Sequence, residues 1–263
     1  MTRQDPAADL RPGDHYVQSF ARGLAVIRSF SAAAPRQTLT EVAGRTGLTR
    51  AGARRILLTL QTLGYVESDG KLFALTPRIL DLGFAYLSSM PMWNVAEPLM
   101  EALVEQVKES CSAAVLEGTD ILYVLRVPTR KIMRNSLGIG SRLPAYCTSM
   151  GRMLLAGLPD DEVLRLLRAQ PLEARTRHTL TDPQALLARV QQARRQGWCL
   201  VNQELEEGLV SMAAPITDRM GRTIAAINIS GQANRTPPRQ MQEAMLAPLR
   251  DAAREISRRL GGS

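Results

Sequence analysis

Apolar and polar residues recur with a helical period in two neighbouring stretches between residues 38 and 63. The first stretch predicts a short helix from the apolar residues Leu39, Val42, Ala43 and Leu48. Gly47 follows its last turn, where a residue that tolerates positive φ is favoured, and Thr49 can cap the next helix. That helix should end near residue 63, because one of its faces carries Ala53, Ile56, Leu57, Leu60 and Leu63.

A hairpin is predicted directly after the second helix. Residues 64–67 and 71–75 have the composition of short strands, and Asp69-Gly70 between them favours a tight turn. Two helices separated by a glycine-containing turn and followed by a hairpin are typical of a winged helix-turn-helix domain. The second helix would then be the recognition helix.

Two further segments flank this region. A helix over residues 16–30 should pack under the recognition helix through its apolar stripe of Phe20, Leu24, Ile27 and Phe30. Residues 32–37 are predicted as a loop. After the hairpin, Pro77 favours the first turn of another helix, which reaches about Ser89. Because this helix is apolar on more than one face, we expect it to pack against a neighbouring domain or a second copy of the chain.

Helices and strands are mixed from residue 93 onward. Their patterns predict helices over residues 94–109, 149–156, 160–168, 183–196 and 238–260. They predict strands over residues 111–116, 121–127, 131–137, 198–202, 209–217 and 223–230, and a loop over 138–144. This order indicates an antiparallel sheet of five or six strands with helices on one or both faces.

The fold class that follows is α+β, with an N-terminal winged helix-turn-helix domain, a linker helix and a C-terminal domain built on an antiparallel sheet. The expected divisions are a mobile tail at residues 1–15, the DNA-binding domain at 16–76, the linker helix at 77–92 and the second domain at 93–263.

The net charge of the chain indicates an anionic binding partner. The formal net charge of the 263 residues is +8 and the sequence pI is about 10.0. Nucleic acid is the usual partner of such a chain, and an anionic membrane surface is the competing one. Between Tyr16 and Arg78 the only acids are Glu41, Glu67 and Asp69, against nine lysines and arginines. The excess of positive charge therefore lies in the predicted winged helix-turn-helix.

The polar face of the recognition helix supplies candidate contacts to double-stranded operator DNA. Arg50 and Arg54 lie one turn apart, and an arginine can hold guanine O6 and N7 with two hydrogen bonds, so both are expected at base edges. Phosphate contacts are expected from Arg45, Arg55 and Lys71, with Thr49 at the helix start. The alternative is an ordinary solvated basic face. The hairpin, the glycine turn and the shortage of acids favour DNA.

Cysteine usage and hydropathy limit the other partners. Cys111, Cys147 and Cys199 are odd in number and form no CxxC pair, so neither a disulfide framework nor a zinc finger is predicted. His15 and His178 are far apart, and no cofactor or metal is expected. An apolar run of about 18 residues is lacking, and residues 1–14 do not resemble a signal peptide. We therefore expect a cytoplasmic protein that is not associated with a membrane.

Enzymatic activity is the main alternative class. A nucleophile elbow of the GxSxG type, a Walker A motif, GxGxxG and HExxH are all missing from the sequence. The run Thr148-Ser149-Met150-Gly151 lacks a nearby basic partner that could activate the serine, and His178 lies in a polar segment. Because these catalytic motifs are missing, we expect no enzymatic activity.

A nonspecific nucleic-acid packaging protein is a third class. It would explain the charge but not the large second domain.

The chain resembles the IclR family of bacterial transcriptional regulators over residues 16–260. In the first domain the likeness lies in RGLAVIRSF from Arg22, the run LTEVAGRTGLTRAGARRILLTL from Leu39 and LGYV from Leu63. In the second it lies in GIGSRLPAYCTSMGRMLLAGLP from Gly138 and EEGLVSMAAPITDRMGRTIAAINISG from Glu206. The resemblance implies a GAF-like effector domain that binds a small molecule, and homodimers or dimers of dimers.

A narrower resemblance concerns regulators of the β-ketoadipate pathway and of hydroxybenzoate use. It lies in RVPTRKIM from Arg126, LPAYCTSMGR from Leu143 and NQELEEGL from Asn202. That branch responds to protocatechuate, 4-hydroxybenzoate or β-ketoadipate, and it usually carries Asp where Asn202 stands. The alternative is a repressor of the same family that responds to an unrelated small organic acid.

The resemblance implies a pocket between the sheet and residues 138–151. Its wall would comprise Leu143, Ser149, Met150, Asn202, Leu209, Ser211, Asn228 and Ser230. Strand spacing supports part of this set, because Asn228 and Ser230 are two residues apart and so face one side of a sheet. Small polar residues in apolar strands suit a ligand site, although they can equally bond within the sheet.

An aromatic acid in that pocket would need a positive group. Arg134 and Arg126 are the candidates from the strands, and Arg152 is the candidate from the helix that starts at Ser149. The free N–H groups at this helix start could also receive a carboxylate. The three cysteines could line the cavity, although such cysteines are more often small buried apolar residues.

Overall fold

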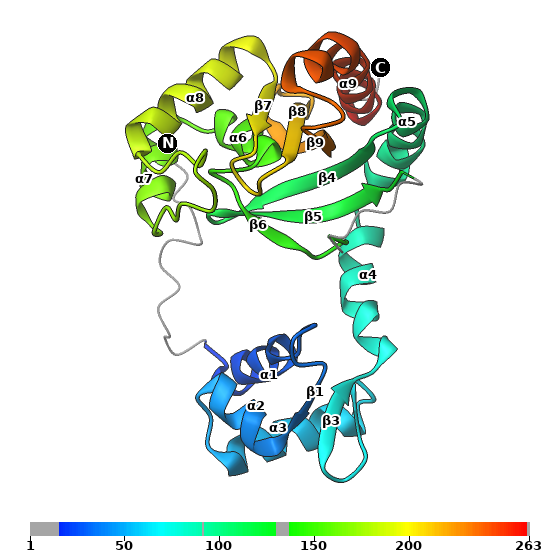
Figure 1. Ribbon diagram of the computed structural model, residues 1–263. Coiled ribbons are helices and arrows are strands. Elements are labelled where there is room, and N and C mark those ends of the chain that lie inside the picture. The colour runs from blue at the N-terminus through cyan, green and yellow to red at the C-terminus, as the bar shows by residue number, and fades with distance from the viewer. Residues whose placement is uncertain (1–15, 91, 130–136, 262–263) are drawn as a thin grey trace. The chain divides into compact units, whose positions relative to one another are not determined.

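The computed structural model describes residues 16–90, 92–129 and 137–261 of the chain (Figure 1). The chain divides into two compact units, Met1–Ser89 and Met90–Ser263. The predicted tail at 1–15 and most of the predicted strand at 131–137 lie outside the described residues.

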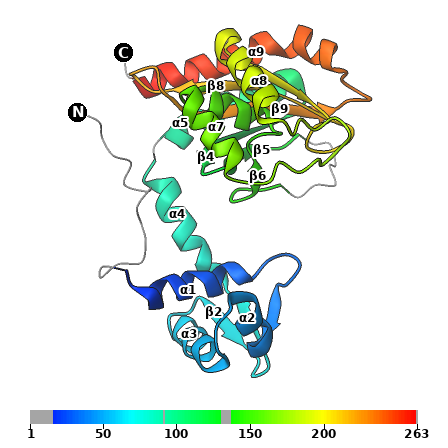
Figure 2. The same cartoon turned by 90° about the vertical axis from the view of Figure 1, so that its left-hand side faces the viewer.

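The first unit is a three-helix domain with a small sheet. Its helices are α1 (Gln18–Ser29), α2 (Leu39–Thr46) and α3 (Arg50–Thr62). Helix α1 packs against both α2 and α3 (Figure 2). The core is formed by Val26, Val42, Ala43, Ala53, Leu57, Leu60 and Val66. Strands β1 (Arg36–Thr38), β3 (Leu72–Leu75) and β2 (Val66–Ser68) form an antiparallel sheet in that order.

Local signals fix the two helices of the helix-turn-helix. Helix α2 begins with a capping box, in which the Thr38 N–H donates to Glu41 Oε2 at 2.7 Å and the Glu41 N–H donates to Thr38 Oγ1 at 3.3 Å. Gly47 ends the helix in the left-handed region with φ of 65°. The Gly52 N–H donates to Thr49 Oγ1 at 3.1 Å, so Thr49 caps α3 as predicted.

Two details of this unit differ from the prediction. Residues 36–38 form a strand rather than the end of a loop, because Arg36 pairs with Ala74 of the hairpin and Gln37 is buried. The predicted apolar stripe of α1 was also wrong in part. Val26 faces the core, whereas Phe20 is 68% exposed and Leu24 is 42% exposed, since the helical twist carries them away from the packed side.

A short helical segment ends the first unit. The 3₁₀ turn η1 (Pro77–Ile79) leads into α4 (Leu80–Ser88). Its large apolar side chains are exposed within this chain: Leu80 is 70% exposed and Phe84 is 69% exposed. The segment therefore carries apolar surface that the described part of the chain leaves uncovered.

The second unit is a six-stranded antiparallel sheet with the order β6-β5-β4-β9-β8-β7. The strands are β4 (Ser110–Glu117), β5 (Asp120–Val127), β6 (Arg142–Pro144), β7 (Cys199–Asn202), β8 (Leu209–Thr217) and β9 (Thr223–Gln232). Strand β6 lies within the predicted loop 138–144. It was missed because it has only three residues and ends in Pro144, at a sheet edge where proline is tolerated.

Helices cover both faces of this sheet. Helices α5 (Met92–Val107) and α9 (Pro238–Gly261) pack on each other and on strands β4, β5, β8 and β9. Helix α6 (Ser149–Ala156) packs on the strands, and α8 (Pro183–Gln196) and α7 (Asp160–Arg168) follow outside it (Figure 1). Strand residues therefore alternate between two cores. Ala226 faces the core around α6, while its neighbour Ile227 is fully buried outside that cluster.

In the described part of the chain no helix is both long and apolar enough to cross a membrane.

Candidate DNA-binding helix and ligand pocket

The polar face of α3 carries three exposed arginines, Arg50, Arg54 and Arg55. Arg45 is exposed in the last turn of α2, and Lys71 is exposed beside the hairpin turn. None of these five cations forms a salt bridge with a described residue. By contrast, the neighbouring Arg36 is held by Asp69 at 2.8 Å. All predicted DNA contacts, Thr49 included, thus lie on the exposed surface of the winged helix-turn-helix.

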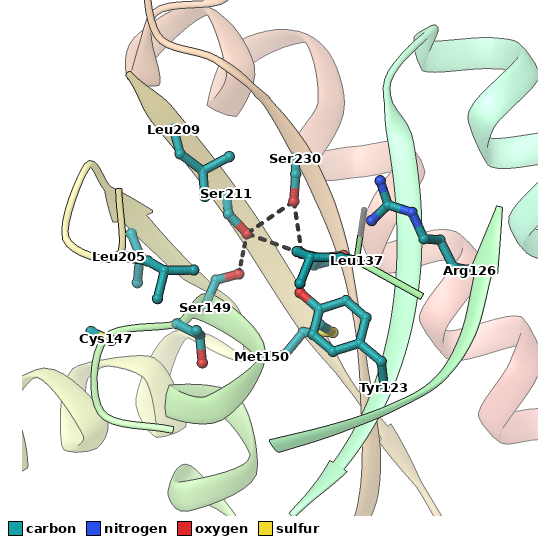
Figure 3. Close-up of a pocket in the computed structure, with 13 residues that line it drawn as sticks. Tyr123, Arg126, Leu137, Cys147, Ser149, Met150, Leu205, Leu209, Ser211 and Ser230 are labelled. Carbon is teal, nitrogen blue, oxygen red and sulfur yellow. Dashed lines mark hydrogen bonds between the residues drawn. The ribbon is translucent and has the colours of Figure 1, made fainter. Parts of the chain in front are cut away.

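One cavity of the second unit lies at the start of α6, beside strands β5, β8 and β9 (Figure 3). It contains about 480 Å³ of space between atoms, including the solvent-filled mouth. About half of the lining residues are apolar or aromatic and the others are polar: Tyr123, Arg126, Leu137, Cys147, Thr148, Ser149, Met150, Val201, Leu205, Leu209, Ser211, Asn228 and Ser230.

Four polar side chains form a connected network on one side of the pocket (Figure 3). The Asn228 amide donates to Ser211 Oγ at 3.1 Å and to Ser230 Oγ at 2.8 Å. Its Oδ1 accepts the Ser112 N–H at 3.1 Å, which fixes the orientation of the amide. Ser211 Oγ and Ser149 Oγ are 2.5 Å apart. Because Asn228 already donates to Ser211, the Ser211 hydroxyl is free to donate to Ser149.

The start of α6 adds hydrogen-bond donors to this side. Ser149 and Met150 are the first residues of the helix, whose first-turn N–H groups have no partner within the helix. Thr148 is the cap and accepts the Gly151 N–H at 3.2 Å. Gly151 is required here, because a Cβ atom at this position would lie 2.2 Å from the Ala145 carbonyl oxygen. The close contact between Gly151 and Ala145 packs the first turn of α6 against residues 145–148, beside the pocket.

Arg126 and Tyr123 line the pocket from strand β5. Arg126 Nη1 donates to Ser112 Oγ at 3.4 Å, so the guanidinium lies next to the strand that orients Asn228. Burial raises the pKa of Tyr123 from 10.0 to about 12. Its phenol is protonated at neutral pH, as for any tyrosine, and can donate a hydrogen bond. A cation, several hydroxyls and helix N–H groups beside apolar walls suit a small organic anion.

The structure brings together most of the predicted pocket residues but not all of them. Ser149, Met150, Leu209, Ser211, Asn228 and Ser230 line the cavity, as do Arg126 and Cys147. Leu143 does not, because it lies on edge strand β6 and packs against the core. Asn202 lies at the end of β7 and lines a separate groove beside α8. Arg134 lies outside the described residues.

Arg152 corrects another expectation. Its guanidinium does not line the pocket. It is held by Glu204, with Nη1–Oε1 and Nη2–Oε2 distances of 2.8 and 2.5 Å, so it is not available as the cation for an acid in the pocket. The three cysteines are buried, and burial raises the pKa of Cys147 to about 11. Of the three, only Cys147 lines the pocket.

The prediction missed five lining residues: Tyr123, Leu137, Thr148, Val201 and Leu205. Strand pairing could have identified Val201, which lies opposite Ser211 across β7 and β8. Leu205 lies outside the regular elements and carries no periodic signal. In the described part of the chain, no group of three or more His, Cys, Asp or Glu residues could hold a metal ion.

A winged helix-turn-helix with an unpaired basic helix face, joined to a sheet domain with a polar-lined pocket, defines a ligand-controlled DNA-binding regulator. Comparison with protein families agrees. Residues 19–70 match the IclR helix-turn-helix domain, and residues 84–258 match the C-terminal domain of bacterial transcriptional regulator IclR. The chain belongs to the IclR family of transcriptional regulators. It is a regulator and not an enzyme, as its sequence predicted.

Relatives extend over nearly the whole chain. The Pca regulon regulatory protein of Pseudomonas putida is 44% identical over 248 residues, covering 94% of this chain and 85% of its own length. A regulator from Rhodococcus sp. RHA1 shares 50% identity and a TM-score of 0.83, covering 92% and 97%. An IclR homologue from Microbacterium hydrocarbonoxydans, crystallised with 4-hydroxybenzoate, has 27% identity and a TM-score of 0.81, covering 92% and 98%.

Proposed function

We propose that this protein binds operator DNA through α3 and the hairpin, and that an aromatic carboxylate of the hydroxybenzoate type in the pocket controls its effect on transcription. The observation that carries the proposal is the composition of the pocket. Apolar side chains from Met150, Leu205 and Leu209 can contact a ring, and the polar groups gather on one side. Such an arrangement both accommodates and orients an amphipathic ring compound.

The polar side suits a carboxylate in particular. The Ser149 N–H and Met150 N–H groups at the start of α6 favour an anion. The Asn228 amide donates to Ser211 Oγ and Ser230 Oγ, and Ser230 Oγ donates to Ser211 Oγ at 3.5 Å. With Ser211 donating to Ser149, the Ser149 hydroxyl hydrogen is left to point at an acceptor. Arg126 supplies a positive charge to the same pocket. All of these groups donate hydrogen bonds, and a carboxylate only accepts them.

Two similar proteins, one with a known ligand and one with a known regulon, support this class of effector. The Microbacterium homologue was crystallised with 4-hydroxybenzoate, and the Pseudomonas relative regulates the Pca regulon. We therefore assign 4-hydroxybenzoate or protocatechuate as the first ligands to test, with β-ketoadipate as the aliphatic member of the set.

A homodimer, or a dimer of dimers, is part of the proposal. Exposed apolar side chains on α1 and α4, among them Phe20, Leu24, Leu80 and Phe84, would be covered by a second copy. Two recognition helices can then enter successive major grooves of a palindromic operator, about 34 Å apart. We place this assembly in the cytoplasm, where it meets its operator.

Thermal unfolding with and without ligands tests the effector class. We expect 4-hydroxybenzoate or protocatechuate to raise the melting temperature, because a ligand at one hundred times its Kd stabilises the folded state by about 2.7 kcal/mol. The Asn228→Ala variant should lose this response, because Asn228 organises the serine hydroxyls. The matched control Asn202→Ala, outside the pocket, should keep it. No stabilisation by any aromatic acid, or loss of the response in both variants alike, would reject the proposed ligand class.

A further inference from the structure

A buried ion pair lies behind the pocket, at the wall of the groove beside α8 that Asn202 also lines. The side chains of Arg152 and Glu204 are only 3% and 10% exposed. The two pair through both guanidinium Nη atoms and both carboxylate oxygens, at 2.8 and 2.5 Å. Neither residue lines the proposed effector pocket, although both line the groove beside α8. An effect of the pair on the effector would therefore be indirect.

The pair ties together segments that are far apart in sequence. Arg152 belongs to α6, and its Nε donates to the Tyr146 carbonyl oxygen at 3.0 Å. Glu204 belongs to the segment between β7 and β8, and its Oε2 also accepts the Leu180 N–H at 3.2 Å. One guanidinium thus joins residues 145–148, helix α6 and residues 203–208, and the carboxylate adds residues 176–180.

Each of these tied segments except residues 176–180 supplies part of the pocket wall. Cys147 and Thr148 follow Tyr146, and Ser149 and Met150 lie one turn before Arg152 on α6. Leu205 follows Glu204 directly. A change in the Arg152–Glu204 distance must therefore move Leu205 relative to the start of α6, which alters the width of the pocket.

The segment that carries Leu205 has an unusual backbone that needs such support. Gln203 has a φ of 59°, in the left-handed region that non-glycine residues rarely adopt. Its carbonyl oxygen accepts the Thr176 hydroxyl at 2.6 Å, and the Glu204 carbonyl oxygen accepts the Thr179 hydroxyl at 2.6 Å. Directional bonds to Gln203 and Glu204 thus hold the turn that aims Leu205 at the pocket.

Stability alone does not explain a buried ion pair. Replacing such a pair with apolar residues of similar volume is often neutral or stabilising, because both charges lose their hydration on burial. What charged hydrogen bonds add is fixed geometry, since a bidentate arginine–carboxylate pair permits only a narrow range of distances and angles.

We propose that Arg152 and Glu204 are positioning residues of the effector pocket: without touching the ligand, the pair sets the separation between α6 and Leu205 and so determines affinity and selectivity for the ring. The identity of the ligand rests on the proposed function, but the placement of the 203–208 segment does not.

The test is the Arg152→Met, Glu204→Leu double variant, whose apolar side chains replace the buried pair. A matched control is Arg194→Met, Asp160→Leu, which removes the partly exposed 2.7 Å pair between α8 and α7 and the Arg194 Nε bond to the Ala156 carbonyl oxygen at the far end of α6. It leaves the bonds of residues 203–208 intact. We expect the first variant to fold cooperatively and to bind 4-hydroxybenzoate at least tenfold more weakly in calorimetry. It should also discriminate less against a ring with a 3-methoxy group. The control should keep both properties.

Amide hydrogen exchange in the absence of ligand decides the proposal independently of the effector. Exchange at residues 203–208 should accelerate at least tenfold in the Arg152→Met, Glu204→Leu variant and stay unchanged in the control. Unchanged exchange, or unchanged affinity and selectivity in a protein that binds the acid, would overturn the proposal. If the wild type binds no aromatic acid, only the proposed effector class fails, and exchange still gives the answer. If the apolar variant does not fold, Arg152→Gln, Glu204→Gln takes its place in the same measurements.

Discussion

At the scale of single residues, the chemistry of the pocket depends on groups that stay neutral and donate hydrogen bonds. The serine hydroxyls and the Asn228 amide have no charge. The Tyr123 phenol is protonated at neutral pH, and burial raises its pKa further, to about 12. Arg126 is the one arginine among the described lining residues. The pocket thus combines one positive charge with several neutral donors, which favours one carboxylate over two.

Tyr123 gives a prediction about pH. Its pKa rises from 10.0 to about 12 because burial penalises the phenolate, so the folded state holds this proton more tightly than the unfolded state. The stabilising contribution is complete below pH 10 and is lost as pH rises from 10 to 12. The melting temperature of Tyr123→Phe should therefore fall less steeply than that of the wild type across this interval. Thermal unfolding at closely spaced pH values measures the difference, and parallel curves would contradict it.

Sequence reasoning located some of these residues and could not locate others. Asn228 and Ser230 were recognisable because strand alternation places them on one face, beside a resemblance that implies ligand contacts. Arg152 looked like a ligand cation because its partner Glu204 lies 52 residues away, and no local pattern connects the two. A side chain's role depends on which groups can reach it, and that is decided by tertiary packing.

At the scale of elements, boundaries were predictable wherever the chain carries capping residues. Helix α3 begins after Thr49, and α8 begins after Asp182, whose side chain accepts the Ala185 N–H at 2.7 Å. Strands β1 and β6 were not predictable. Each has three residues, too few to show a period, and each exists only because a distant strand pairs with it.

The recognition helix and the hairpin should contribute differently to DNA binding. We expect Arg50→Ala to reduce discrimination between the operator and unrelated DNA by about 1–3 kcal/mol, because a bidentate contact to guanine is lost. Lys71→Ala should weaken binding to all DNA alike and lower the salt slope by about 1, because a phosphate contact is lost. Fluorescence anisotropy with both DNAs over a range of salt concentrations separates the two effects. Equal and sequence-independent losses in both variants would refute this division of roles.

At the scale of the whole molecule, regulation requires that ligand binding in one unit changes what the other unit does. A ligand shifts an equilibrium only by its difference in affinity between two states. The apolar surface of α4 is the natural place for such a difference, because α4 ends the first unit, its large side chains are exposed, and the proposed dimer would cover them. Coupling energies of this kind are typically about 1–3 kcal/mol.

Transcription from a promoter to which the protein binds, measured in a purified system with and without 4-hydroxybenzoate, tests the central claim most directly. We predict at least a fivefold change for the wild type, half-maximal near the measured Kd of the acid. The change should disappear with Asn228→Ala, which removes the organiser of the pocket, and should become smaller with Arg50→Ala, which reduces operator discrimination. Transcription that stays the same, although the protein is bound to the operator and the acid is bound to the protein, would contradict control by this pocket.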